Sequence, residues 1–407
     1  MSERTMKLGH LPVLTWNRLR LNSGRTESVP AEGVTVLHGG FDNLPAGVTH
    51  TLLDNAEASE YIRRYAVKQP QEAVVAGKVP AYHPQAFATG LGAEFENYLD
   101  SMDCGADLIQ VQPGMLALVP VIWGAMPAEN ERALTGQIIH LGKGAQLTLI
   151  QLIIPRERLS GGTTVHRDGG EEGAGRFLGM MTRVILEEGA HLHLVNVQIL
   201  GSDSVFLYDA GSSQEKGSGL MVTSLQLGGR EVFNGMHADL SGEGAEFDDH
   251  TGYMALLDHK LDMTVTCTQR GPATRSEIIY DGVLSGTAKK DLKYTIDFRK
   301  GSKGASGNER ENVLMLSEEA ENRSMPVILC EEEDIDGRHG ATIGRPDRDT
   351  LFYMQSRGIS KDAAIRMLTK ARIDAVAQRI GEPKIAELIG HFTEEAFENG
   401  SVEFTVS

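Results

Sequence analysis

Hydrophobic and polar residues alternate in short runs through the middle of the chain, between about residues 109 and 336. Clear examples are 146–152 (QLTLIQL), 191–197 (HLHLVNV) and 261–267 (LDMTVTC). Successive side chains of a strand point to opposite faces, so this alternation predicts strands that each bury one face. No helical pattern interrupts the runs, which favours a core built from β-strands.

A short phrase recurs just before several of these runs. It occurs at 144–147 (GAQL), 189–192 (GAHL) and 244–247 (GAEF), each time as a turn glycine, a small residue and an inward apolar residue. Weak internal repetition of this kind is typical of a solenoid. We therefore predict a β-solenoid core over residues 109–336. A jelly roll or β-sandwich is the alternative, because the number of strands alone does not separate these architectures.

Helical spacing replaces the alternation toward both ends of the chain. Apolar residues recur at near-helical intervals in 51–66 and at every fourth position in 86–99. These patterns predict amphipathic helices. We therefore expect residues 1–108 to form an N-terminal helical region.

Residues 337–407 also read as helical and carry start and stop signals. Asp349 is placed to cap a short helix, and Ser360 to cap a longer one. Gly381 is expected to end the longer helix, with Pro383 in the first turn of the last helix. Because these signals agree with the apolar periodicity, we predict a C-terminal helical region here.

Charge and composition narrow the choice of partners. The formal net charge of −17 argues against nucleic acid, which needs a clustered positive face. One basic stretch, 289–303, is expected to be a solvated sheet edge. The first residues lack an apolar run of signal-peptide length, and no stretch of membrane-spanning length is free of charge. With only three separated cysteines, these features predict a cytoplasmic protein without a membrane partner.

Candidate chemistry is sparse along most of the sequence. No Gly-x-x-x-x-Gly-Lys-[Ser/Thr] loop occurs, so we expect no ATP hydrolysis by this chain and no enzymatic activity. His191 and His193 share one face of a predicted strand and could bind a metal, but the pattern places them on the solvent side. Cys267 is expected to point into the core as a packed thiol.

The segment 326–359 concentrates the most distinctive residues. It predicts a strand ending at Cys330, an acidic turn at 331–334, a further turn at Gly337, and then His339 between small residues. A histidine with nearby carboxylates can bind a borderline metal. From the pattern alone, a packed hinge histidine and a solvated acidic turn are the favoured interpretation.

A family resemblance changes this interpretation. Residues 339–344 (HGATIG) and 351–359 (LFYMQSRGI) resemble the signature of the SufB/SufD family of iron–sulfur cluster assembly proteins. Shorter phrases that are similar to the family lie at 11–12, 15–19, 259–263, 276–278, 326–330 and 333–334. The resemblance implies a right-handed parallel β-helix between helical N- and C-terminal regions. It also implies that SufB and SufD pair, that a cluster is assembled near their interface, and that an isolated chain forms a homodimer.

Within the family, the sequence is more similar to SufD than to SufB. SufB-like chains carry His-Glu-Ala-Thr where this sequence has His-Gly-Ala-Thr at 339–342, and Gly340 offers no oxygen ligand for iron. His339 matches the SufD histidine at the assembly interface, so the resemblance implies that it is a ligand for transient iron or a nascent cluster, with no tightly bound cofactor. Two positions depart from the family, Gly337 where SufD often has Cys and Gln269 where the family often has His. Cys330 is the candidate substitute thiol.

The resemblance further implies that the C-terminal helical region docks the ATPase subunit SufC. The docking residues would be Leu351, Phe352, Tyr353, Met354, Arg357 and Gly358. The alternative within the family is a SufB-type scaffold that acts with SufC alone, which Gly340 disfavours. A β-helix polysaccharide enzyme is a third class, but the predicted outward strand positions show no repeating Asp ladder.

Overall fold

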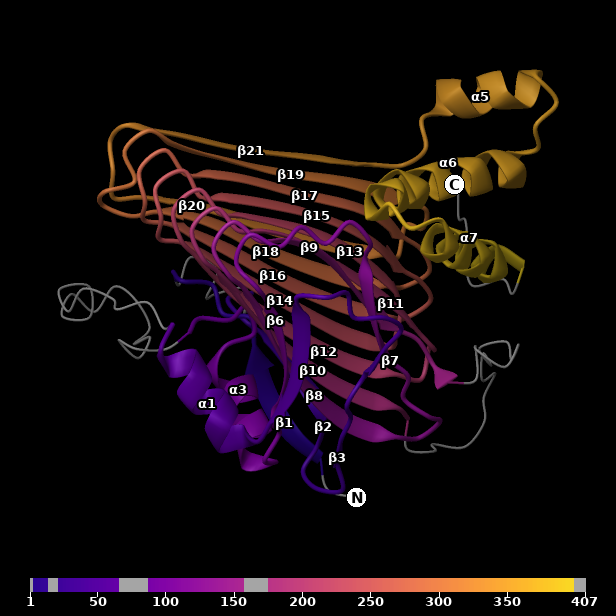
Figure 1. Cartoon of the computed structure of the whole chain (residues 1–407). Helices are drawn as coiled ribbons and strands as arrows, with labels where there is room; N and C mark the ends of the chain where they lie inside the picture. Colours follow the sequence, from indigo (N-terminus) through magenta and orange to yellow (C-terminus); the bar gives the residue numbers. More distant parts are fainter. Residues whose placement is uncertain (1–2, 14–20, 66–86, 157–174, 399–407) are drawn as a thin grey trace.

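The computed structural model describes residues 3–13, 21–65, 87–156 and 175–398, so the family-like phrase at 15–19 lies outside the described residues. The centre of the molecule is a parallel β-solenoid of about eight turns, in which the chain alternates between two sheets (Figure 1). The predicted mainly β solenoid with helices toward both termini is confirmed. Its parallel pairing excludes the jelly roll and the β-sandwich, which are antiparallel.

Each turn contributes one strand to each sheet, and consecutive strands of a sheet pair in parallel. The first sheet contains β6 (Ala106–Val111), β8 (Arg132–Leu141), β10 (Phe177–Leu186), β12 (Val205–Gln214), β14 (Glu231–Leu240), β16 (Lys260–Gln269), β18 (Lys289–Phe298) and β20 (Glu321–Cys330). The second sheet contains β7 (Val121–Ala125), β9 (Gln146–Ile153), β11 (His191–Leu200), β13 (Gly219–Gly228), β15 (Glu246–Ala255), β17 (Arg275–Leu284), β19 (Ala305–Met315) and β21 (Ile335–Gly344).

The register stacks like residues in columns between the two sheets. Leu194, for example, pairs with Leu149 of the previous turn and Val222 of the next. Cys267 is buried in the same interior cluster as Leu261, so its predicted inward direction is confirmed. The continuous apolar column holds successive turns together.

The recurring Gly-Ala phrase forms the corners of the solenoid. Gly144, Gly189 and Gly244 adopt φ of 67°, 69° and 67°, a left-handed conformation that favours glycine. The alanine that follows each glycine is fully buried. The phrase therefore marks where the chain turns into β9, β11 and β15.

The N-terminal region contains strands as well as helices. β1 (Glu3–Leu8) pairs with β2 (Gly24–Pro30), β3 (Thr35–Val36) pairs with β8, and β4 (Gly40–Phe41) and β5 (Val48–Leu53) run antiparallel to β7 and β6. The helices are α1 (Asn55–Arg63) and α3 (Ala93–Ser101). Residues 51–53, expected to be helical, extend along β6 because α1 begins only after its N-cap, Asp54. The boundary expected at residue 108 falls inside β6.

Three helices follow the last strand. They are α5 (Arg348–Ser356), α6 (Lys361–Ala377) and α7 (Pro383–Glu398), with a 3-10 turn, η2 (Gln378–Ile380), between the last two. Ser360 caps α6, and Gly381 ends η2 at a φ of 73°, as predicted. The cap of α5 is Asp347, so the prediction of Asp349 was wrong. Asp349 already lies within the first turn of α5, and the side chain of Asp347 accepts from the Thr350 N–H.

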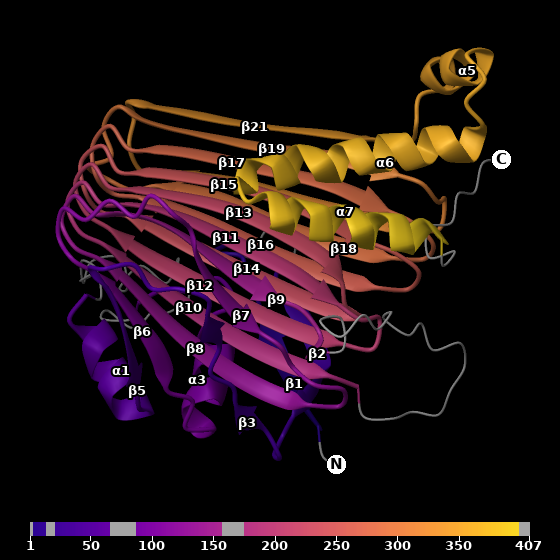
Figure 2. The same ribbon diagram turned by 45° about the vertical axis from the view of Figure 1, so that its right-hand side comes forward.

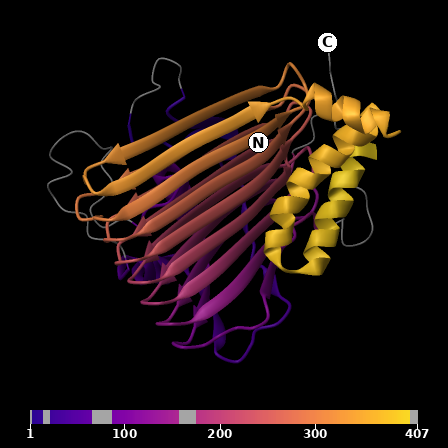
Figure 3. The same ribbon diagram turned by 90° about the horizontal axis from the view of Figure 1, so that it is seen from above.

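The helices differ in how they contact the solenoid. α6 and α7 lie along the outer face of the second sheet, whereas α5 stands away from both sheets (Figure 2). Seen from above, the three helices occupy one flank of the solenoid (Figure 3). Among the described residues, no helix is long and apolar enough to cross a membrane.

Two expectations from the sequence need correction. The boundary at residue 336 and the turn at Gly337 fall inside β21, which pairs with β19 along its length although glycines weaken its strand pattern. The basic stretch 289–303 is not a solvated edge throughout, because Lys290 and Lys293 are buried in ion pairs with Glu311 and Asp262.

Candidate functional site

The last turn of the solenoid, formed by β20 and β21, is an open end. Each of these strands has a hydrogen-bonded strand on one side, and no strand in the described part of the chain pairs with its other edge. Nearly every residue of β21 is exposed, whereas strands one or two turns earlier are mostly buried. An unpaired strand edge presents free N–H and C=O groups to another chain.

His339 lies in the middle of β21 and is exposed. It is in register with Glu309 of β19, which faces the solenoid interior. Register neighbours in a parallel sheet point to the same face, so the imidazole lies on the inner side of the last turn. It is exposed because no further turn covers it. The interpretation of His339 as a packed hinge histidine is therefore wrong. The side chain is exposed and could contact another subunit.

Gly340 is not required by the fold. A Cβ at this position would meet nothing within 4 Å. The missing carboxylate that separates this sequence from SufB-like chains is therefore not imposed by packing.

The two departures from the family pattern have structural explanations. A Cβ on Gly337 would lie 3.1 Å from the Phe298 ring and 3.3 Å from Ile328, so a larger residue here would require these side chains to shift by a few tenths of an ångström. Gln269 is fully buried, and its amide donates to Ser276 Oγ at 2.8 Å and accepts from Thr274 at 2.8 Å. Gln269 therefore has a packing role in the interior.

Cys330 is an exposed free thiol at the end of β20. It is in register with Phe298, so it also lies on the inner side of the last turn. After the turn 331–334 the chain returns through Ile335, and His339 lies four residues further, or about 13 Å along the strand. The structure thus places Cys330 and His339 on one surface without bringing them together. Within the described ranges, no group of three His, Cys, Asp or Glu residues is arranged to hold a metal.

Glu309 is a residue that the sequence analysis did not identify. Its side chain is fully buried, and neither carboxyl oxygen has a hydrogen-bond partner. Burial raises the pKa of this carboxyl to about 9. The signal in the sequence was the alternation in 305–313, which puts Glu309 and Glu311 on the same face as Val313.

The predicted docking residues divide into two groups on α5. Leu351 is buried, and Met354 is partly buried, against the apolar cluster that α6 and α7 form with the outer face of the second sheet. Both residues therefore anchor α5. Phe352 and Tyr353 are 73% and 59% exposed. Arg357 lies over the Tyr353 ring at 5.3 Å, and Gly358 ends the segment at a φ of 85°. Two aromatic rings of α5 are therefore available to a partner.

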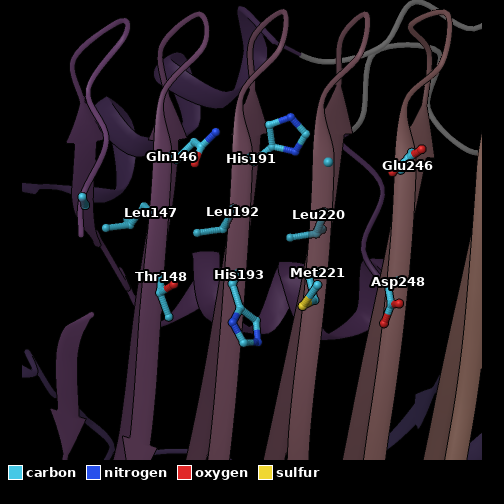
Figure 4. Close-up of a pocket in the computed structure, with 12 residues that line it drawn as sticks. Gln146, Leu147, Thr148, His191, Leu192, His193, Leu220, Met221, Glu246 and Asp248 are labelled. Atoms are coloured by element: carbon cyan, nitrogen blue, oxygen red, sulfur yellow. The ribbon is translucent and has the colours of Figure 1, made fainter. Parts of the chain in front are cut away.

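A hollow of about 350 Å³ lies on the outer face of the second sheet and is lined by His191 and His193 (Figure 4). The outward direction predicted for both histidines is confirmed. Gly219 leaves room beside His191, because a Cβ there would lie 2.5 Å from its Nδ1. His193 Nε2 contacts Thr223 Oγ at 3.0 Å, and burial, aided by Arg379, lowers its pKa. The hollow thus holds two imidazoles on the outer face of the second sheet, that of His191 exposed and that of His193 half-buried.

Comparison with known proteins is consistent with this architecture. The family model described as "SUF system FeS cluster assembly, SufBD core domain" matches residues 128–372, which include the solenoid from β8 onward and α5. Over 130 residues the chain is 30% identical to the iron–sulfur cluster assembly protein SufD of Bacillus subtilis (strain 168), covering 32% of this chain and 30% of that protein.

Other relatives match over longer stretches. An iron–sulfur cluster assembly SufBD family protein of Mycobacterium leprae (strain TN) is 25% identical over 211 residues, covering 50% of this chain and 54% of that protein. One of Staphylococcus epidermidis (strain ATCC 12228) is 21% identical over 200 residues, covering 49% and 43%. The chain thus spans between 30% and 54% of these three relatives. Because the family model covers more than half of the sequence, the chain belongs to the SufBD family of iron–sulfur cluster assembly proteins.

Proposed function

We propose that the chain is a SufD-type scaffold subunit of the SUF system, which pairs with a SufB-like subunit through the open end of its solenoid. The observation that carries the proposal is the exposed His339 on an unpaired edge strand. The chain would work in the cytoplasm without enzymatic activity of its own.

Pairing at the open end follows from the physics of strand edges. A partner strand laid along β20 or β21 would satisfy their free backbone groups by β-augmentation. The same surface on a second copy of this chain would be self-complementary about a two-fold axis, so a homodimer is the expected state of the isolated chain. In the complex, the partner would cover the inner side of the last turn and face His339.

The proposed role of His339 is to ligate iron or a nascent cluster through a neutral imidazole nitrogen. The iron is cargo, held between two subunits and then passed on. Cys330 ends β20 and His339 lies in the middle of β21, on the other sheet, so the SufB-like partner would supply the thiolates. Gly340 adds no carboxylate, which favours the SufD-type role over the SufB-type role.

The ATPase SufC would dock on α5. Phe352 and Tyr353 are exposed large aromatic residues, a composition typical of interface anchors. Leu351 and Met354 would hold α5 in place rather than contact SufC directly, because they pack against the helical core.

The test is cluster reconstitution on the co-purified complex with SufB-like and SufC subunits. His339→Ala should leave complex formation unchanged and reduce the visible absorption of the assembled cluster to a small fraction. His191→Ala, an exposed histidine on the outer face, is the matched control and should behave as the wild type. Normal cluster formation by His339→Ala would refute the ligand role. Efficient reconstitution of the chain with SufC alone would instead favour the SufB-type scaffold.

A further inference from the structure

Two glutamates on β19 have the same orientation but different surroundings. Glu309 and Glu311 both face the solenoid interior, and both are fully buried. A buried carboxyl group is ordinarily hydrogen-bonded or paired with a cation. The two residues differ in this respect, because one has protein partners and the other has none.

Glu311 is part of a complete network. It forms an ion pair with Lys290, accepts a hydrogen bond from Ser324 and accepts another from Tyr253 at 3.2 Å. Lys290 also donates to Ser324 Oγ at 3.2 Å. Both carboxylate oxygens of Glu311 are thus satisfied, so this residue stabilises the packing of β18, β19 and β20.

Glu309 has none of these contacts. Neither of its oxygens has a hydrogen-bond partner, although the group is completely buried. In the ladder its neighbours are Ile278 on β17 and His339 on β21. An unpartnered buried acid weakens folding, so its presence beside the exposed imidazole calls for a functional explanation.

We propose that Glu309 and His339 together form this chain's half of a divalent-metal site at the open end, suited to Fe²⁺. The proposal rests on the proposed function, because it extends the role given there to His339. Adjacent strands lie about 4.8 Å apart, so register neighbours on one face can both reach a single ion. A carboxylate oxygen and an imidazole nitrogen are ligands that Fe²⁺ accepts, and Glu309 would release its proton to solvent when the ion binds. The remaining ligands would come from the partner subunit or from water.

The location of Glu309 fits this role better than a packing role. It lies one strand inside the open edge, so an ion held by the exposed imidazole is within reach of its carboxylate. Replacing Glu309 by Gln removes a ligand but leaves no protein partner unsatisfied, because the carboxyl has none. Metal affinity and stability should therefore respond differently to this substitution.

The test is anaerobic titration of the purified full-length chain with Fe²⁺ alone, with thermal unfolding of each variant. We expect Glu309→Gln to weaken Fe²⁺ binding at least about tenfold while the midpoint of thermal unfolding is unchanged or raised. Glu333→Gln, an exposed acid in the turn before β21, is the matched control and should bind as the wild type. His339→Ala should weaken binding by a similar factor.

Each other outcome would overturn the proposal. Wild-type affinity in Glu309→Gln, with weak binding in His339→Ala, would remove Glu309 and leave the proposed function intact. Weak binding in Glu309→Gln alone would remove His339 as a ligand and refute both proposals. A large loss of thermal stability in Glu309→Gln would show a structural role, and absence of Fe²⁺ binding by the wild type would exclude the site.

Discussion

The two ends of the solenoid are built from the same repeated turn, but only the first turn is covered by further strands of the described chain. At the first turn, β4 and β5 reverse direction and pair antiparallel with β7 and β6, and α1 lies beside β5 (Figure 2). At the last turn, β20 and β21 have no such cover among the described residues. A solenoid needs capping structures at its ends to remain soluble. The difference supports the proposal that another subunit pairs with the uncovered end.

A second contrast lies within one strand, β19. Glu311 pairs with Lys290 and accepts a hydrogen bond from Ser324, whereas Glu309, two residues earlier, has no hydrogen-bond partner. The fold therefore uses one buried carboxyl group of β19 for packing and leaves the other unpaired. The predictions below test this contrast in order of decreasing effect.

Breaking the closed network should have the largest effect. Lys290→Met would leave the buried Glu311 without its cation and lower the free energy of unfolding by about 3–5 kcal/mol. Lys289→Met removes an exposed pair with Glu321 and should cost less than about 1 kcal/mol. Denaturant unfolding of both variants measures the difference. Equal effects would show that the interior pair contributes no more than a surface pair.

Disrupting the open end should weaken association. Ile343 is a half-exposed apolar residue of β21, and Ile343→Asp should raise the dissociation constant of the homodimer at least about tenfold, or about 1.4 kcal/mol. Leu118→Asp, on an equally apolar and 92% exposed site before β7, should leave association unchanged. Analytical ultracentrifugation distinguishes them. The opposite ranking would place the interface beside the first turn.

The pH dependence of stability tests how the segment before α3 is attached to β12, because Leu91 of this segment donates to Asp209 of that strand. Burial raises the pKa of Asp209 to about 8, although the Leu91 N–H donates to its Oδ1 at 2.7 Å. Between about pH 4 and pH 8 the folded chain therefore keeps a proton that the unfolded chain has released. Through Asp209 alone, raising the pH in this window should lower the free energy of unfolding by at most about 1.4 kcal/mol per pH unit.

Asp209→Asn keeps a carbonyl acceptor for Leu91 and should flatten this dependence. Unfolding measured across the same pH window gives the slope for each protein. An unchanged slope in the variant would assign the dependence to other groups.

The smallest effect should appear at α5. Asp347→Ala removes the side chain that accepts from the Thr350 N–H at 2.9 Å, so the backbone amides of α5 should exchange a few-fold faster. Asp349→Ala, in the first turn but not at the cap, should change exchange less. Hydrogen exchange resolved by mass spectrometry compares the two, and a larger effect of Asp349→Ala would contradict the capping assignment.

The features that sequence reasoning predicted are local. Strand alternation, the corner glycines such as Gly144, and the helix signals at Ser360 and Gly381 depend on neighbouring residues, so a short window contains the information. The exposure of His191 and the burial of Cys267 followed from the same alternation.

The features it missed depend on residues far apart in the sequence. Lys290 looks like part of a solvated basic run because its partner, Glu311, lies 21 residues away. The sequence pattern of 48–53 does not identify β5 as a strand, because this strand is defined by its pairing with β6. The position of His339 in a strand was hidden by glycines on either side. In the candidate site, His339 could be predicted from a sequence motif. Glu309 could be identified only from the register between β19 and β21, which places it next to His339.

Hydrogen exchange of residues 335–344 tests the role of the open end most directly. In dilute, monomeric chain these amides of β21 should exchange quickly, and association with a second copy or with a SufB-like subunit should slow them strongly. Unchanged exchange at 335–344, together with new protection around β4 and β5, would contradict the assignment of the open end as the subunit interface.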